Sequence, residues 1–309
     1  MTAPLFTIRV PGSTSNLGPG FDSIGLAVNK YLIVKVYSHY EWTCKSKSEL
    51  LSGMPEDEQN FLIQIACKTA QQYNAMLPYC RLEVESEIPL ARGLGSSASA
   101  IVAGIEIANI LCDLGLTKQE KLELACSFEG HIDNVGASLY GGMTTGTYGE
   151  EYTALVSYPI LEVEIVAVIP SYELKTSAAR QVLPKQLPYK QAVRSSGMAN
   201  LLVAAILTNN WKIAGEAMQR DLFHESYRLS LVPELELLRG FSQHEHIFGC
   251  SLSGAGPTVI CYVAKGAGKD VQQYLQPFFP KCIVEVLEAE NKGIQVYYNS
   301  VEQEHLESL

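Results

Sequence analysis

Residues 89–100, which read PLARGLGSSASA, constrain the fold of this chain more than any other stretch. Gly93 and Gly95 let a backbone approach a ligand closely, because glycine carries no side chain. The apolar run that begins at the end of this stretch, AIVAGIEIANIL, predicts a helix that Ser96 or Ser97 can cap. Free amides at the positive end of such a helix bind anions, so we predict a phosphate-binding loop. The alternative for a bare Gly-x-Gly pattern is an ordinary corner between a strand and a helix.

Two familiar glycine-rich motifs do not account for this stretch. The P-loop pattern GxxxxGK followed by Ser or Thr occurs nowhere in the chain. Residues 93–98 do fit the dinucleotide-binding pattern GxGxxA, but the first strand of that motif is buried on both faces and continuously apolar. Here Leu82, Val84 and Ile88 alternate with polar residues, which is typical of a half-exposed, antiparallel strand. A nicotinamide-dependent dehydrogenase is therefore disfavoured.

The composition limits the class of protein. The chain has 309 residues, of which 47% are hydrophobic and 18% charged, enough apolar sequence for the cores of two domains. A formal net charge of −10 argues against a nucleic-acid-binding surface, and no segment has the pattern of a membrane span or a secretory leader. The eight cysteines include no CxxC pair, and several lie in apolar helix or strand patterns, which indicates reduced, buried thiols at those positions. We therefore expect a cytoplasmic protein that binds neither nucleic acid nor membrane.

Strands and helices are mixed along the chain without a strict βαβ order, which predicts an α+β fold. Residues 11–22, PGSTSNLGPGFD, predict a loop between two strands. This loop is too long for a hairpin turn, which favours a binding loop. Asn16 and Asp22 are its candidate ligands.

The region after the central helix predicts a second helix and a polar cluster. Thr117 and Glu120 have the spacing of a capping box, which opens that helix. The helix ends near residues 129–134, EGHIDN, where four polar side chains lie within six positions. Residues 139–147 predict a strand bent by glycines.

The second half of the chain adds two features that bear on function. Thr176 or Ser177 is expected to cap a helix, and SLSGAGPT at 251–258 forms a second glycine loop ahead of a strand. The pattern loosens around residues 150–158, where we place the boundary between two domains.

Three of these motifs, at 11–22, 89–100 and 251–259, stand in an order that resembles the GHMP small-molecule kinases, the superfamily of galactokinase, homoserine kinase and mevalonate kinase. The pattern PxxxGLGSSA is specific to that superfamily, and residues 13–22, 129–135 and 176–180 resemble the homoserine kinases within it. The resemblance covers nearly the whole chain. It implies an N-terminal ATP-binding domain of the ribosomal-protein-S5 type over residues 1–155, a C-terminal ferredoxin-like domain over residues 156–309, and an active site in the cleft between them.

The resemblance also implies roles for individual residues in phosphorylating the side-chain hydroxyl of L-homoserine, a step of threonine biosynthesis. Ser97 and Glu129 would hold Mg²⁺, and Asn134 would orient the attacking hydroxyl. The phosphates of ATP would be wrapped by Pro89, Leu90, Ala91, Arg92, Gly93, Leu94, Gly95, Ser96, Ser97, Ala98 and Ser99. The two charged ends of homoserine would be bound by Asn16, Asp22, His131, Asp133, Thr176, Arg180 and Arg228. Among these residues we expect Ser97, Glu129, Asp133, Asn134 and Arg180 to be catalytic.

The chemistry of an amino-acid acceptor suits this set. Asp22 or Asp133 can pair with the ammonium, while Arg180 and Arg228 supply forked donors for the carboxylate. Asp133 lies about where mevalonate kinases keep a catalytic aspartate, yet phosphoryl transfer depends mainly on positioning and charge neutralisation. We therefore assign Asp133 as a substrate ligand first and a base second.

Two alternatives stay open at this point. Another GHMP kinase, of the shikimate or mevalonate type, would share the ATP-binding residues and differ in the acceptor contacts. A non-catalytic ATP-binding sensor would be expected to lose Ser97 or Glu129, and both are present. Where relatives usually have alanine, this chain has Ser99 and Gly136, which are also small. The resemblance further implies a homodimer.

Overall fold

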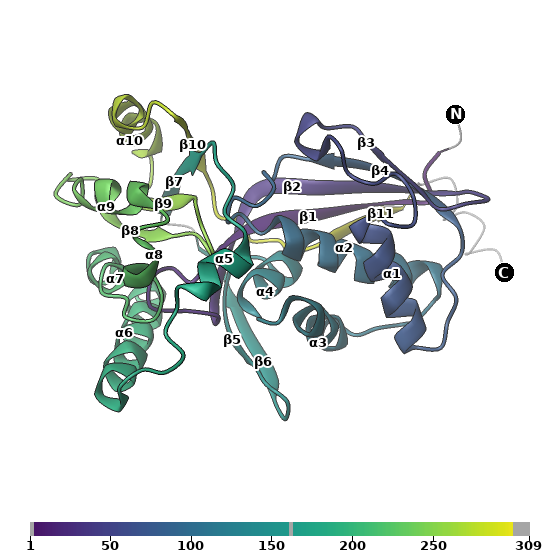
Figure 1. Ribbon diagram of the computed structural model, residues 1–309, viewed down its shortest axis with the longest axis horizontal. Coiled ribbons are helices and arrows are strands. Elements are labelled where there is room, and N and C mark those ends of the chain that lie inside the picture. Colours follow the sequence, from purple (N-terminus) through teal and green to yellow (C-terminus); the bar gives the residue numbers. More distant parts are fainter. Residues whose placement is uncertain (1–2, 161–162, 299–309) are drawn as a thin grey trace.

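The computed structural model describes residues 3–160 and 163–298, which form two sheets with helices packed on them (Figure 1). One sheet has seven strands, in the order β11-β1-β2-β4-β3, with β5 joined to β2 and β6 joined to β5. The other has four strands, in the order β10-β7-β9-β8. The predicted α+β class is confirmed.

The first sheet is built mainly from the N-terminal half of the chain. Its strands are β1 (Phe6–Ser15), β2 (Ile24–Ser38), β3 (Thr43–Ser46), β4 (Cys80–Ser86), β5 (Met143–Tyr148), β6 (Thr153–Tyr158) and β11 (Gln295–Tyr298). Neighbouring strands are antiparallel except for β3 and β4, which are parallel. Alternate residues of β4 are buried, and Leu82 and Val84 point into the core as the sequence predicts.

Four helices cover one face of this sheet (Figure 1). They are α1 (Phe61–Gln72), α2 (Ser96–Leu111), α3 (Lys118–Glu129) and α4 (Asp133–Tyr140), and a short 3-10 turn, η1 (Glu49–Leu51), precedes them. The predicted capping box of α3 is confirmed, because Glu120 N donates to Thr117 Oγ1 at 3.2 Å and Thr117 N donates to Glu120 Oε2 at 2.7 Å. The central helix α2 packs against α1, α3, α4 and β1, so its position is fixed from several sides.

The second sheet consists of β7 (Val163–Pro170), β8 (Ile247–Leu252), β9 (Val259–Ala264) and β10 (Cys282–Leu287), all antiparallel. Around it lie α5 (Thr176–Gln181), α6 (Tyr189–Leu207), α7 (Trp211–Met218), α8 (Glu225–Arg228), α9 (Pro233–Arg239), α10 (Gly268–Leu275) and η2 (Gln276–Phe278). Both faces of β7 are buried. Ile165 belongs to the core cluster shared with the first sheet, whereas Val166 and Val168 pack in a second cluster with α9 and α10. Apolar packing therefore joins the two halves.

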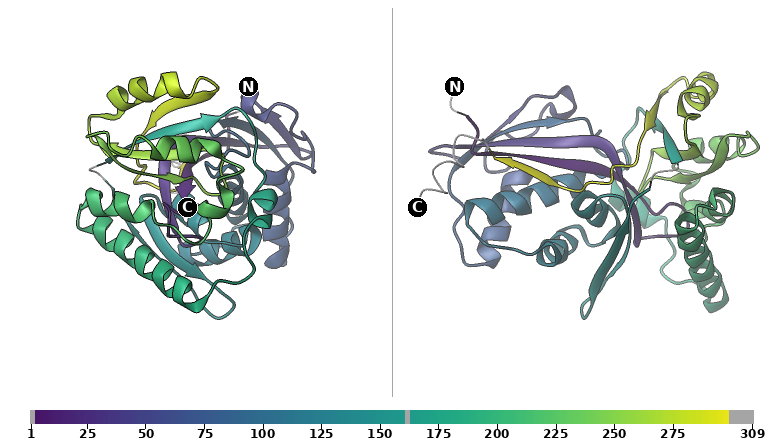
Figure 2. Two further views of the ribbon diagram at one scale, coloured as in Figure 1. Left: turned by 60° about the vertical axis from the view of Figure 1, so that its left-hand side comes forward. Right: turned by 180° about the vertical axis from the view of Figure 1, so that it is seen from behind.

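The last strand of the described residues returns to the first sheet. After β10 the chain crosses back, and β11 pairs antiparallel with β1, with Phe6 opposite Tyr298 (Figure 2). The first and last described strands of the chain are therefore neighbours. The division of the chain at residue 155, which lies inside β6, stays a prediction.

Two expectations about local structure were wrong. Residues 11–15 do not belong to a loop, because β1 continues to Ser15 and pairs with β2 beyond a bulge between Pro11 and Gly12. The strand predicted over 139–147 begins only at Met143, since α4 continues to Tyr140 and two glycines of positive φ then turn the chain.

Two predicted helix caps were also wrong. Gly95, in a left-handed conformation, is the N-cap of α2 in place of Ser96 or Ser97. Lys175 holds that position in α5, in place of Thr176 or Ser177. Within the described part of the chain, no helix is long and apolar enough to cross a membrane.

Candidate active site

A cavity of about 320 Å³ lies where the two sheets meet. Four segments contribute to it: the β1–β2 connection, the glycine loop before α2, the junction of α3 and α4, and the second half of the chain through α5, α8 and the second glycine loop. The predicted residues that line it are Asn16, Asp22, Ala91, Gly93, Gly95, Ser96, Ser97, Glu129, His131, Asp133, Asn134, Thr176, Arg180 and Arg228. The fold therefore brings distant motifs to one concave site of the kind that binds small molecules.

The glycine loop packs tightly against both halves of the molecule. Gly95 has φ of 73°, and a Cβ there would lie 2.2 Å from Ser13 Oγ. Gly93 has φ of 81°, and a Cβ there would lie 2.3 Å from Ser253 O. The sequence reasoning attributed these glycines to ligand approach, but close contacts with β1 and with the second glycine loop already require them.

Several predicted ATP residues support the loop and do not line the cavity. Arg92 donates through Nε to Tyr172 O at 2.9 Å and through Nη2 to Ser171 O at 2.8 Å. Ser99 Oγ donates to Ser96 O at 3.1 Å within the first turn of α2. The others outside the lining are Pro89, Leu90, Leu94 and Ala98, of which Leu94 and Ala98 are buried in the core. These residues fix the shape of the loop.

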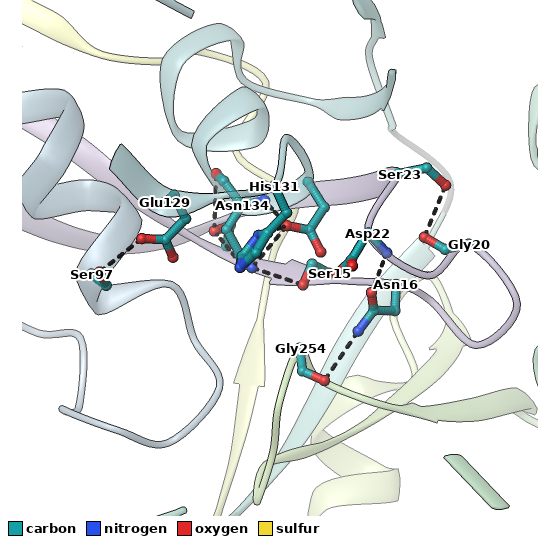
Figure 3. A network of polar contacts seen from close by, with 12 residues as sticks. Ser15, Asn16, Gly20, Asp22, Ser23, Ser97, Glu129, His131, Asn134 and Gly254 are labelled. Carbon is teal, nitrogen blue, oxygen red and sulfur yellow. Dashed lines mark hydrogen bonds and ion pairs between the residues drawn. The ribbon is translucent and has the colours of Figure 1, made fainter. Parts of the chain in front are cut away.

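The predicted metal pair is in contact. Ser97 Oγ in the first turn of α2 donates to Glu129 Oε2 at the end of α3, at 2.9 Å (Figure 3). Burial raises the pKa of Glu129, while His131 and the hydrogen bond from Ser97 act in the opposite direction. A hydroxyl and a carboxylate are hard oxygen donors, so the pair fits Mg²⁺.

The polar cluster after α3 is organised around a buried carboxylate. Asp133 is 2% exposed, and its Oδ1 lies 2.7 Å from His131 Nδ1 and accepts from Asn134 N at 2.7 Å. Burial would raise the pKa of Asp133, but these hydrogen bonds and the charge of His131 outweigh it and lower the pKa. Burial alone would lower the pKa of His131, and the contact with Asp133 raises it instead. A carboxylate of low pKa is a weak base, which favours a binding role for Asp133.

The side-chain amide of Asn134 is oriented by β1. Its Nδ2 donates to Ser15 Oγ at 2.8 Å, and its Oδ1 accepts from Ser13 Oγ at 2.9 Å (Figure 3). All three residues are buried, so the direction of the amide is fixed before any ligand binds. Ser15, which lines the cavity, is absent from the predicted set.

The connection between β1 and β2 is shaped by Asn16 and carries Asp22. Asn16 Nδ2 donates to Gly254 O at 3.0 Å, and its Oδ1 accepts from Asp22 N at 3.0 Å (Figure 3). Arg180 of α5 then forms a two-pronged ion pair with Asp22, with Nη2 at 2.7 Å from Oδ1 and Nη1 at 3.1 Å from Oδ2. The two residues predicted for opposite ends of the substrate are therefore bound to each other.

Arg228 is held by a buried network. Its Nε donates to Ala179 O and its Nη1 to Gly254 O, both at 3.0 Å, and Nη1 also lies 3.0 Å from His224 Nδ1. His224 Nε2 lies 2.9 Å from Gly18 O, so this nitrogen carries the proton and Nδ1 accepts from Arg228. Burial lowers the pKa of His224 to about 4, which keeps the imidazole neutral, and burial lowers that of Arg228 to about 10.

Asp22, His131 and Asp133 form one acidic cluster. Each offers a ligand atom within 4.8 Å of the other two, an arrangement that attracts a cation. Of its members, Asp22 or Asp133 was predicted to pair with the ammonium of an amino acid, and the charges of His131 and Asp133 also act on Glu129.

The sequence reasoning missed a further part of the lining. The missed residues are Ser15, Phe21, Leu174, Lys175, Gly254, Ala255 and Gly256. The second glycine loop carried a usable signal, because it stood out as a motif and needed only assignment to the same site. Leu174 and Lys175 gave no signal beyond their position next to Thr176.

Comparisons with known proteins show what this chain is similar to. Residues 60–142 match the family model of the GHMP kinases N terminal domain, and residues 202–281 match that of the GHMP kinases C terminal. The homoserine kinase of Bacillus velezensis is 46% identical over 299 residues, which cover 97% of each chain. That of Halalkalibacterium halodurans is 47% identical over 298 residues and 96% of each chain. The crystal structure of homoserine kinase from Cytophaga hutchinsonii has a TM-score of 0.82 and 25% identity, covering 96% of this chain and 98% of that one.

Proposed function

Because this chain belongs to the homoserine kinase family of the GHMP kinases, we propose that it transfers the γ-phosphate of ATP to the side-chain hydroxyl of L-homoserine. The observation that carries the proposal is the composition of one cavity. At one side lie the glycine loop and the Ser97–Glu129 pair, and at the other lie the charged groups Asp22 and Arg180. One cavity would thus offer groups for a phosphate donor and for a zwitterionic acceptor.

The glycine loop and the first turn of α2 would bind the phosphates of ATP. Ser96 and Ser97 begin a helix of 16 residues whose first amides are available to an anion. Ser97 and Glu129 would hold Mg²⁺, which GHMP kinases use with ATP and which neutralises phosphate charge when bound. Burial raises the pKa of Glu129, and its half-buried carboxylate would gain from a cation beside it.

The charged residues on the other side would bind the two ends of homoserine. Asp22, close to Asp133 in the acidic cluster, would pair with the ammonium, and Arg180 would pair with the carboxylate. Nε and Nη1 of Arg228 already donate to the protein, so only its Nη2 is left for the carboxylate among the described contacts. Asn16 and Thr176 would complete this end of the cavity.

The reaction itself would depend on positioning. Asn134, fixed by Ser13 and Ser15, would orient the hydroxyl toward the phosphate. Asp133 would act as a ligand, since its low pKa makes it a poor proton acceptor. Phosphoryl transfer requires little covalent chemistry from the protein, so positioning and charge neutralisation would account for most of the catalysis.

An acceptor screen tests the proposal. The protein is incubated with ATP and Mg²⁺ together with homoserine, mevalonate, shikimate or galactose, and release of ADP is measured. We expect turnover with homoserine well above the other three, which would exclude the other GHMP kinase types. Faster turnover with another acceptor would reassign the substrate, and no turnover with ATP bound would favour the sensor alternative.

The family resemblance also supports a homodimer and a cytoplasmic location, which we include in the proposal. Light scattering on the purified protein measures the first, since a dimer has twice the mass of 33.9 kDa. Fractionation of cells measures the second.

A further inference from the structure

The ion pair between Asp22 and Arg180 occupies the place proposed for the charged ends of the substrate. Two hydrogen bonds join the side chains, which are 34% and 38% exposed and therefore reachable from the cavity. Phe21 lies beside them, with the guanidinium carbon of Arg180 at 5.5 Å from its ring centroid. Each group of the pair is satisfied by the other, and each must exchange its partner when an amino acid enters.

We propose that this pair is a selectivity latch, which opens for an acceptor that carries both an ammonium and a carboxylate and stays closed against an acceptor with only one of these charges. The identity of the acceptor rests on the proposed function, whereas the latch rests on the contact between Asp22 and Arg180. Its role would be to exclude other small alcohols of the cell.

The exchange of partners decides which ligand opens the latch. A zwitterion replaces one ion pair by two, so Asp22 and Arg180 both remain paired. A ligand with one charge pairs with one of them and leaves the other without its partner, which makes opening unfavourable. A half-exposed pair of this kind contributes at most about a fivefold factor to an equilibrium, so two new charged contacts are enough to displace it.

The surroundings hold the two groups in place and strengthen this selection. Asp22 is anchored by its backbone amide on Asn16, and Arg180 follows Ala179, whose carbonyl is bound by Arg228. A carboxylate without an ammonium would face the acidic cluster of Asp22, His131 and Asp133. An amine without a carboxylate would face two guanidinium groups, since Arg228 also lies 5.5 Å from the ring of Phe21.

Three ligands that differ only in charge test the latch: homoserine, 4-hydroxybutanoate, which lacks the ammonium, and 3-amino-1-propanol, which lacks the carboxylate. Their affinities are measured by calorimetry, and kcat/KM is measured with ATP. Asp22→Asn should weaken the binding of homoserine at least tenfold, yet tighten the binding of 4-hydroxybutanoate by up to about fivefold, because Arg180 is released. Arg180→Met should likewise weaken the binding of homoserine, and it should tighten the binding of 3-amino-1-propanol, because Asp22 is released. We call this combination, weaker binding of homoserine with tighter binding of a ligand of one charge, the crossover in binding. A residue that merely shapes the pocket would not produce it.

Two controls separate the latch from general effects. In the double variant Asp22→Asn/Arg180→Met, neither 4-hydroxybutanoate nor 3-amino-1-propanol should bind more tightly than to the wild-type protein. Both charged side chains that would bind these ligands are then absent. Lys175→Met removes another positive charge that lines the cavity and should not favour 3-amino-1-propanol. Thermal unfolding of each variant confirms that it is folded. An equal gain in Lys175→Met would overturn the latch in favour of net charge alone.

Failure of the latch and failure of the proposed function give different results. If Asp22→Asn leaves the affinity for 4-hydroxybutanoate unchanged or weaker while the wild-type protein phosphorylates homoserine, the latch is wrong and the function stands. If the crossover in binding appears but homoserine is not phosphorylated, the latch stands and the assigned activity is wrong.

Discussion

At the glycine-loop end of the cavity the lining is mainly backbone, whereas at the acceptor end it is a set of charged side chains. Gly93 and Gly95 leave no room for a Cβ, and their loop is bound through carbonyls and amides, such as Leu174 N to Ala91 O at 3.1 Å. The acceptor end instead depends on the Asp22–Arg180 pair and on the network around Arg228.

This difference teaches which changes each end tolerates. A backbone-built surface recognises phosphate, a group common to all nucleotides, and is altered mainly by changes of shape. A side-chain-built surface recognises one arrangement of charges and is altered by single substitutions without a change of fold. Four substitutions distinguish the glycine-loop end from the acceptor end, and the expected effect is largest at Glu129 and smallest at His224.

Glu129 is bound to Ser97 beside the glycine loop, and its loss should have the largest effect. Glu129→Gln removes a charge from the proposed magnesium pair, so kcat should fall by about two orders of magnitude or more, while ATP affinity changes less. Steady-state kinetics at saturating Mg²⁺ measure both. The matched control is Glu123→Gln on the exposed face of the same helix, which should behave as wild type. Turnover near that of wild type in Glu129→Gln would remove Glu129 from the site.

Arg180 tests the acceptor end alone. Arg180→Ala should lower kcat/KM for homoserine by roughly ten- to a hundredfold, because a charged contact that positions the substrate is lost. Arg180→Lys keeps the charge without the fork and should restore only part of the loss. KM for ATP should stay constant in both variants. A parallel loss of ATP binding would show that the two ends are not independent.

Gly95 tests the glycine-loop end alone. Gly95→Ala places a Cβ against Ser13 in a left-handed backbone, so we expect the free energy of unfolding to fall by about 2 kcal/mol and ATP to bind more weakly. Gly115→Ala is the matched control, since Gly115 has φ of 63° with nothing within 4 Å of its Cβ position. That control should lose about 1 kcal/mol from strain and bind ATP normally. Chemical denaturation and calorimetry distinguish the two variants.

His224 holds Arg228 of the acceptor end through a hydrogen bond. Its substitution should have the smallest effect on catalysis at neutral pH. His224→Gln should lower kcat/KM for homoserine only about fivefold, the value of one hydrogen bond. The pKa of His224 is lowered from 6.5 to about 4, so the stability that its contacts with Gly18 and Arg228 supply is complete above pH 6.5. This stability is lost as the pH falls from 6.5 toward 4, because the unfolded chain then binds a proton that the fold excludes.

The measurement for His224 is the difference in unfolding free energy between wild type and His224→Gln across this range. It should shrink on acidification. If the difference in unfolding free energy between wild type and His224→Gln instead grows as the pH falls, His224 is not a neutral imidazole in the folded protein.

Local signals in the sequence were enough for most elements and for the glycine-loop end. The alternation in β4, the capping box at Thr117 and the glycines of the loop all act over a few residues. The polar run Ser13 to Ser15 misled the prediction for a physical reason. Small polar residues favour turns, yet here they form a buried strand because Asn134 and Ser253 satisfy their hydroxyls from far along the chain.

The acceptor end could be predicted only as a set of residues, without its contacts. Asp22 and Arg180 are 158 positions apart, and no local pattern indicates that they bind each other. The same holds for Arg228, whose donors are taken up by Ala179 and Gly254. Such pairings depend on how the two sheets meet, which the resemblance to a family implies and spacing alone does not.

The pairing of β11 with β1 has a consequence for synthesis on the ribosome. The nascent chain makes β1 long before its outer neighbour, residues 295–298. Throughout the intervening translation this edge of β1 has none of the described strands beside it, while the second sheet is completed. Open strand edges attract other chains, so this edge is the place where a chaperone would bind during synthesis and where premature release would lead to aggregation.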